Sequence, residues 1–184
     1  MKKRAMIILA DGFEEIEAIT PIDILRRAEV EVVIAGLGGM VRTGSHGIAV
    51  KADILFDDCK GEHPDAIILP GGSPGAEHLA SSVKVKDMVL HMHSKRKLIA
   101  AICASPALVL APIGILAGKI ATCFPGLEKL FSSDIKFVKD EVVQSDNIIT
   151  SRGAGTSAGF GFKIAENLVG KAKADMVAKQ MLFA

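Results

Sequence analysis

The chain has 184 residues, of which 49% are hydrophobic and 23% are charged, and its mean hydropathy is +0.37. Its 22 basic and 21 acidic residues leave a net charge of +1, which favours neither nucleic acid nor an anionic membrane surface as a partner. The apolar fraction excludes a disordered chain, and no stretch approaches the roughly 18 uncharged apolar residues of a membrane helix. The length predicts one domain over residues 1–184.

Short apolar runs alternate with helical patterns along the chain. We expect strands at residues 5–10, 30–35, 66–69, 98–102, 119–123 and 147–150. We expect helices at residues 15–28, 82–95, 104–110, 159–168 and 172–182. This alternation predicts an α/β fold with a mostly parallel sheet covered by helices.

Two segments interrupt the alternation. Between Leu37 and Ile54 the apolar period changes to two and glycines punctuate the chain, which predicts a small antiparallel ribbon. A short polar insertion, Ser132 to Asp146, predicts a second ribbon.

The three cysteines are Cys59, Cys103 and Cys123, and an odd number indicates reduced thiols. The N-terminal apolar run, residues 5–10, is too short for a signal peptide, so we expect a cytoplasmic location. Cys59 is expected to be a surface-loop thiol, whereas Cys123 ends a strand and could border a cleft at the sheet edge. The cysteines lack zinc-ligand spacing, and His91 and His93 project to different sides of a helix, so no metal is expected.

Cys103 lies between a predicted buried strand and a predicted helix, which is the position of a nucleophile elbow. A helix N-terminus lowers the pKa of a thiol because it stabilises the thiolate, the reactive form. The alternative is that Cys103 is a small buried hydrophobic residue, as free cysteines often are.

Other residues at the predicted strand ends could assist Cys103. Glu14, Glu15 and Glu17 begin the first helix, where carboxylates complement the helix dipole, but one of them could turn inward and share a proton with the thiol. The turn at Gly71 and Gly72 could present backbone N–H groups as an oxyanion hole. The nucleotide-binding glycine motifs are missing, so no nucleotide cofactor is expected.

Four segments in order along the chain are similar to the ThiJ/PfpI superfamily, and more narrowly to the subfamily of the parkinsonism-associated protein deglycase (DJ-one) and its bacterial relatives. They read LADGFEEIE at residues 9–17, IILPGG at 67–72, LIAAICA at 98–104 and ITSRGAGT at 149–156. The resemblance implies a flavodoxin-like three-layer sandwich, a homodimer and no obligatory metal or nucleotide.

The resemblance also assigns roles to individual residues. Cys103 resembles the elbow nucleophile and oxidation-sensing cysteine, and Glu17 resembles the carboxyl group that hydrogen-bonds its sulfur. Gly72 and Ala104 resemble the backbone donors beside the sulfur. Arg27 resembles an arginine near the pocket and the dimer contact.

The chain departs from one well-known relative at several pocket positions. Phe124 replaces a histidine, which removes a His-assisted mechanism, although bacterial relatives also have Phe-Pro here. His46 stands in place of an arginine and Ala154 in place of a proline, which affects the anion preference expected of the pocket.

Two functions remain in competition. The first is a cofactor-free enzyme of the glyoxalase III or deglycase type, in which Cys103 adds to a reactive dicarbonyl such as methylglyoxal and Glu17 transfers protons to yield lactate. The second is a non-catalytic oxidative-stress sensor or redox chaperone, in which Cys103 is oxidised to sulfinate. A thiamine-pathway role is disfavoured because no phosphate site is evident.

Overall fold

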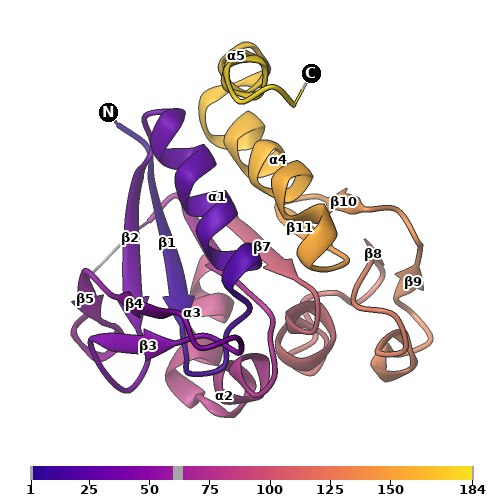
Figure 1. Ribbon diagram of the computed structural model, residues 1–184. Helices are drawn as coiled ribbons and strands as arrows, with labels where there is room; N and C mark the ends of the chain where they lie inside the picture. The colour runs from indigo at the N-terminus through magenta and orange to yellow at the C-terminus, as the bar shows by residue number, and fades with distance from the viewer. Residues whose placement is uncertain (1, 60–63, 184) are drawn as a thin grey trace.

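The computed structural model describes residues 2–59 and 64–183. In this part of the chain, a seven-stranded sheet with the order β10–β11–β7–β6–β1–β2–β5 lies between two helical layers (Figure 1). Its strands are β1 Arg4–Leu9, β2 Glu31–Gly36, β5 Ile54–Leu55, β6 Ala66–Leu69, β7 Leu98–Ile102, β10 Val142–Ser145 and β11 Ile148–Ser151. All neighbouring strands pair in parallel except β10, which is antiparallel to β11. This is the α/β, flavodoxin-like arrangement expected from the sequence.

The central strands are apolar on both sides because helices cover both faces of the sheet. In β1, Ala5, Ile7 and Leu9 join one core, whereas Met6 and Ile8 join the other. One layer consists of α1 Glu15–Arg27, α4 Ser157–Val169 and α5 Lys171–Gln180. The other consists of α2 Gly75–Ser81, α3 Val83–Ser94 and a π-helical turn, Pro106–Leu110.

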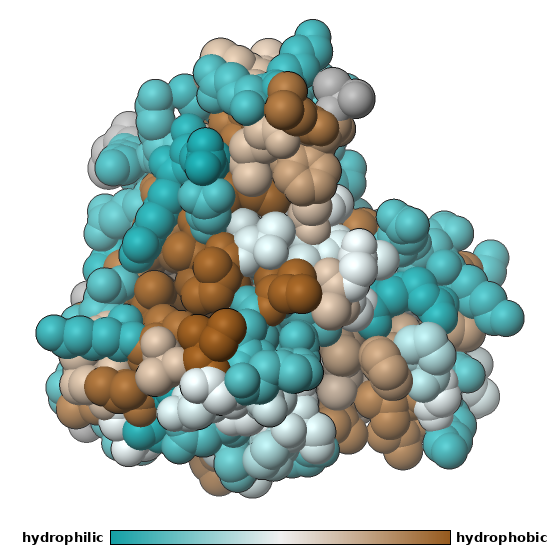
Figure 2. Space-filling model, viewed as in Figure 1, coloured by the Kyte–Doolittle hydropathy of each residue, from teal (hydrophilic) through white to brown (hydrophobic). Residues whose placement is uncertain are grey.

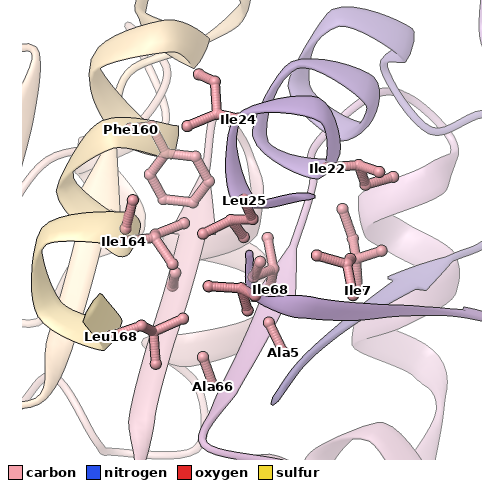
Figure 3. Packing of buried hydrophobic residues seen from close by; sticks show 14 of the residues in the cluster. Ala5, Ile7, Ile22, Ile24, Leu25, Ala66, Ile68, Phe160, Ile164 and Leu168 are labelled. Carbon is pink, nitrogen blue, oxygen red and sulfur yellow. The ribbon is translucent and has the colours of Figure 1, made fainter. Parts of the chain in front are cut away.

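The helices α1 and α4 pack closely against each other above the sheet. Figure 3 shows Phe160 and Ile164 of α4 beside Ile24 and Leu25 of α1. A Cβ at Gly161 would lie 2.8 Å from Cδ1 of Ile24, so only glycine lets the two helices approach this closely. This contact positions α1, whose first turn reaches the carboxyl edge of the sheet.

The two predicted ribbons have different outcomes. The first is confirmed, since β3 Val41–Thr43 pairs antiparallel with β4 Ala49–Lys51. The second is wrong: β9 Lys136–Phe137 pairs in parallel with β8 Ile120–Ala121, while β10 adds to the main sheet. The polar pattern predicted extended chain here, but the two halves do not pair with each other: β9 pairs with β8, which precedes it, and β10 forms a hairpin with β11, which follows it directly.

Two further expectations need correction. The strand expected at residues 119–123 is reduced to β8, which lies outside the main sheet. Helix α2 was not predicted because it follows directly on the Gly- and Pro-rich turn at residues 70–75. Short 3₁₀ turns occur at Phe56–Asp58, Glu128–Leu130 and Ala154–Thr156. Among the described residues, every helix is too short or too polar to cross a bilayer.

Candidate active site

The loops that follow β1, β6, β7 and β11 meet at one edge of the sheet because these strands run parallel. The Glu14 N–H donates to the carbonyl of Gly71 at 3.1 Å, which joins the loops after β1 and β6. The Cys103 N–H donates to the carbonyl of Ser151 at 2.9 Å, which joins the end of β7 to that of β11. Candidate side chains distant in sequence are thereby brought to a common place.

Cys103 occupies a strained elbow at the end of β7. Its φ is +65°, a conformation that non-glycine residues rarely adopt and that costs on the order of 1–3 kcal/mol. Hydrogen bonds hold it on both sides: its N–H donates to Ser151, and its carbonyl accepts from Phe124 N–H at 2.8 Å. Behind it, the buried Ser105 hydroxyl donates to the carbonyl of Pro70 at 2.6 Å. The partly exposed thiol therefore has a fixed direction.

Glu17 reaches the thiol from the first turn of α1. Its side chain is buried, and Oε2 accepts a hydrogen bond from the Gly71 N–H at 2.8 Å. A Cβ at Gly71 would lie 2.7 Å from that Oε2, 2.6 Å from Cβ of Cys103 and 3.0 Å from its Sγ. The carboxyl group and the sulfur thus face the same small volume, which stays open because residue 71 has no side chain.

Burial raises the pKa of Glu17 to about 7, although hydrogen bonds with Gly71 and Cys103 act to lower it. Burial and the nearby charge of Glu17 raise the pKa of the Cys103 thiol to about 12. The sequence argument considered only the helix N-terminus, and these two effects act in the opposite direction. Because both pKa values are raised, the pair loses a single proton near neutrality and titrates as one unit.

Backbone N–H groups of Gly72 and Ala104 point at the sulfur and lower the thiol pKa against these effects. Gly72 has a φ of +92°, and a Cβ there would collide with the backbone of Gly12 and Glu14. Both residues are therefore placed as the sequence analysis expected. Gly71 differs: its N–H is used by Glu17, so it positions the carboxyl group rather than serving as a free oxyanion donor.

Phe124 forms a wall beside Glu17. A Cβ at Gly153 would lie 3.5 Å from Cδ2 of the Phe124 ring and 3.8 Å from Oε1 of Glu17. The ring is 48% exposed. Of the pocket residues Arg27, His46 and Phe124 proposed from the sequence, Phe124 is the one that lies near Glu17.

Arg27 lies away from the pair within a single chain. It ends α1, about 15 Å along the helix from Glu17 at 1.5 Å per residue, and its Nε donates to Asp23 at 2.9 Å. A role for Arg27 at the site would require a second copy of the chain.

His46 lies at the rim, held by Glu15. The buried Glu15 carboxylate accepts from the His46 N–H at 2.8 Å, the Ile48 N–H at 3.3 Å and the His46 ring at 3.1 Å. Burial acts to raise the pKa of Glu15, but these bonds and one from its own backbone N–H lower it to about 2. The hydrogen bond to Glu15 raises the pKa of His46.

Glu15 is the structural residue that the sequence reasoning missed. It fastens the β3–β4 ribbon to the start of α1, and a Cβ at Gly44 would overlap its carboxyl group. Three glutamates at a helix start indicated dipole complementation, and only Gly44 in the distant ribbon hinted at a close contact.

The other two cysteines are both buried. The expectation that Cys59 is a surface-loop thiol is wrong, because it packs in the second core and its Sγ donates to the carbonyl of Leu55 at 3.6 Å. Burial and the charge of Glu128 raise the pKa of Cys123 to about 12. Neither environment favours a reactive thiolate.

Among the described residues, Glu14, Glu15 and His46 form one group whose ligand atoms lie within 4.8 Å of one another. The His46 ring already hydrogen-bonds Glu15, and Ser45 donates to Glu14 at 3.1 Å. These hydrogen bonds hold the β3–β4 ribbon against the start of α1, which explains why the three side chains lie together.

Comparison with known proteins gives the family. The profile of the DJ-1/PfpI family matches residues 3–167. The chain is 41% identical over 186 residues to Protein dj-1beta of Drosophila melanogaster, covering 100% of this chain and 99% of that protein. The chain belongs to the DJ-1/PfpI family.

Further members show how the family varies. Protein DJ-1 homolog B of Arabidopsis thaliana is 42% identical over 179 residues, and the match spans 96% of this chain but only 40% of that protein. Glutathione-independent glyoxalase DJR-1.2 of Caenorhabditis elegans is 34% identical over 184 residues, covering 100% of this chain and 98% of that protein. The solved structure of oxidized Toxoplasma gondii DJ-1 superimposes with a TM-score of 0.94 at 39% identity, covering 98% of each chain.

Proposed function

We propose that this DJ-1/PfpI family member is a cofactor-free enzyme that converts small 2-oxoaldehydes such as methylglyoxal into 2-hydroxy acids. Cys103 is the nucleophile and Glu17 the general acid and base. The observation that carries the proposal is the shared volume beside Gly71, within 3.0 Å of both Glu17 Oε2 and the Cys103 Sγ. The name of the nematode relative, a glutathione-independent glyoxalase, supports the same chemistry.

The proposed reaction begins with addition of the Cys103 thiolate to the aldehyde carbon. The C–S bond forms, the carbonyl π electrons move to oxygen, and the N–H groups of Gly72 and Ala104 stabilise the resulting charge. Protonation of that oxygen gives a hemithioacetal.

Glu17 then moves a proton between the two carbons. Its carboxylate removes the C1 hydrogen, and a C1–C2 double bond forms as the C2 carbonyl electrons move to oxygen. The same proton then returns at C2 while the C1 hydroxyl proton passes to the C2 oxygen, which oxidises C1 to a thioester and reduces C2 to an alcohol. Water hydrolyses the thioester, releasing lactate and the thiol. Methylglyoxal and water together therefore supply every atom of lactate, and no external oxidant is consumed. A pKa near 7 suits Glu17 to both directions of transfer.

The direct test is lactate formation from methylglyoxal by wild type and by Cys103→Ser, with chiral separation of the two lactates. We expect one enantiomer from the wild type and none above the buffer rate from the variant. Cys59→Ser, made at a buried thiol that packs in the second core, controls for loss of a cysteine and for trace contaminants. Equal rates in wild type and Cys103→Ser would overturn the proposal.

A second candidate is an oxidation sensor, favoured by one observation: the partly exposed Cys103 thiol lies beside a carboxyl group whose pKa is about 7. A protonated Glu17 could hydrogen-bond a sulfinate oxygen. Intact mass after peroxide treatment distinguishes the roles, because clean gain of two oxygens with negligible lactate production would favour the sensor.

We also propose that the chain forms a homodimer through α1 and the β3–β4 ribbon. Figure 2 presents an apolar area over this region, and Ile16, Ile19, Val41 and Ile48 are exposed there. A second copy would cover them by a two-fold contact. Ile19→Lys should convert a dimer into a monomer in light scattering, whereas Val83→Lys on α3 should not. A wild-type monomer at micromolar concentration would overturn this proposal.

A further inference from the structure

The position of Phe124 near Glu17 bears on which substrates the site accepts. The backbone fixes the residue from two sides: Phe124 N–H donates to the Cys103 carbonyl at 2.8 Å, and Thr122 N–H donates to the Thr150 hydroxyl at 3.0 Å. The Phe124 carbonyl accepts from Leu127 N–H at 3.1 Å. The ring is therefore carried by a segment tied to the nucleophile itself.

The two carboxyl oxygens of Glu17 have different surroundings. Oε2 is occupied by the Gly71 N–H at 2.8 Å. Oε1 lies on the side of Gly153, where a Cβ would be 3.8 Å from it and 3.5 Å from the Phe124 ring. Because residue 153 is glycine, it places no side chain between the ring and Oε1.

The ring is an apolar surface with no hydrogen-bonding group, and about half of it is open. When Cys103 holds the aldehyde carbon, the neighbouring carbon and its substituent must lie within reach of Glu17 for proton transfer. A substituent on that side meets the ring, which can pack against carbon but cannot pair with a charged or hydroxylated group.

We infer that Phe124 is a specificity-determining residue that selects 2-oxoaldehydes with an apolar substituent over glyoxal and over 2-oxoaldehydes with a hydroxylated substituent. This inference rests on the proposed function and names the substrate class of the same site. Contact of one methyl or larger group with an apolar wall is worth about tenfold in kcat/KM, and more for a phenyl group.

The experiment compares kcat/KM for glyoxal, methylglyoxal, phenylglyoxal and hydroxypyruvaldehyde in wild type, Phe124→Leu, Phe124→His and Phe124→Ala. We expect wild type to prefer phenylglyoxal and methylglyoxal to glyoxal. In Phe124→Ala the phenylglyoxal-to-glyoxal ratio should fall about tenfold or more, with glyoxal itself changed less than about threefold. Phe124→Leu should retain most of the preference, and Phe124→His, similar in size but polar, should lose it.

The control is Phe183→Ala, which removes an exposed ring that stacks on Phe162 at a centroid distance of 5.4 Å. Its substrate ratios should equal those of wild type. An equal loss for all aldehydes in Phe124→Ala would overturn the inference, because the ring would then only support the loop.

A readout without turnover separates this inference from the proposed function. Cys103 is alkylated with iodoacetamide and with N-benzyl-iodoacetamide, and the ratio of the two rate constants is measured in each variant. We expect the ratio to fall several-fold in Phe124→Ala and to stay unchanged in Phe183→Ala. If no aldehyde is turned over but this ratio falls, the catalytic proposal fails while the apolar wall stands. An unchanged ratio of rate constants would show that Phe124 does not form an apolar surface beside Cys103.

Discussion

Glu15 and Glu17 lie two residues apart on α1, both buried, and yet their pKa values shift in opposite directions, to about 2 and about 7. Glu15 faces the ribbon, where backbone N–H groups and the His46 ring surround its carboxylate. Glu17 faces Gly71 and the Cys103 sulfur, and its Oε2 accepts one backbone hydrogen bond, from the Gly71 N–H. Burial alone does not decide the charge of a carboxyl group; the number of donors aimed at it does.

The largest expected effect separates the two glutamates by function. Glu17→Gln keeps the shape but removes the transferable proton, so lactate formation should fall by roughly 10²–10⁴. Glu15→Gln should lower turnover less than about tenfold. Peroxide should still oxidise Cys103 in both, as measured by intact mass on the same preparations. Full turnover in Glu17→Gln would show that Glu17 is not the acid–base group.

Glu15 and Glu17 should change the free energy of unfolding in opposite directions as the pH changes. The folded pKa of Glu15 is below its ordinary value of 4.5, so its stabilisation is present above pH 4.5 and is lost as the pH falls toward 2. The folded pKa of Glu17 is raised, so its contribution is present below pH 4.5 and is lost as the pH rises to 7.

Urea unfolding of wild type, Glu15→Gln and Glu17→Gln at several pH values measures both effects. The deficit of Glu15→Gln relative to wild type should shrink by about 2–3 kcal/mol between pH 5 and 2. Glu17→Gln should gain stability relative to wild type between pH 5 and 8. Parallel pH curves for the two variants would contradict the opposite shifts.

Two glycine substitutions should separate the effects of the two glutamates, because one disturbs the surroundings of Glu17 and the other those of Glu15. Gly71→Ala places a methyl group 2.6 Å from Cys103 Cβ and 2.7 Å from Glu17 Oε2, so it should lower turnover at least tenfold. Gly44→Ala overlaps the Glu15 carboxyl group and should lower the free energy of unfolding by about 1–3 kcal/mol while turnover falls less. Gly155→Ala, where nothing lies within 4 Å, is the control. Equal effects of all three would refute this separation.

The smallest expected effect concerns the proton shared by Glu17 and Cys103. After the pair loses one proton near pH 7, the raised thiol pKa keeps most of the remaining proton on the sulfur, and a minor fraction of molecules holds it on Glu17, with a thiolate facing the N–H groups of Gly72 and Ala104. The rate of Cys103 alkylation by iodoacetamide should therefore rise with a midpoint near pH 7, below the ordinary thiol value of about 8.5. A rate that rises only above pH 8 would show that no thiolate forms when the pair loses its first proton.

Much of the fold was predictable because burial of a parallel sheet on both faces leaves a strong pattern. Strands such as Leu98–Ile102 are continuously apolar, and Cys103, which directly follows that strand, has the φ of +65° of a sharp turn at the strand end. The pairing of β9 with β8 was not predictable, because two-residue strands carry almost no period.

The site was predictable in composition but not in geometry. Residue patterns offered three glutamates near Cys103, and only the family resemblance singled out Glu17. The contact of Glu15 with the ribbon depends on a turn that brings His46 back to α1, and the use of Gly71 N–H by Glu17 spans 54 positions. Such contacts are decided by how the loops fold together, which local spacing does not reveal.

Because the three cysteines differ in burial, the number of alkylated thiols in each molecule reports whether that molecule has opened. In the native state one thiol is accessible, and the other two, Cys59 and Cys123, lie in packed surroundings. A brief pulse of alkylating reagent should thus add one label to a closed molecule and three to an opened one. The mass distribution after the pulse counts the two populations directly, molecule by molecule, without any dye or engineered probe.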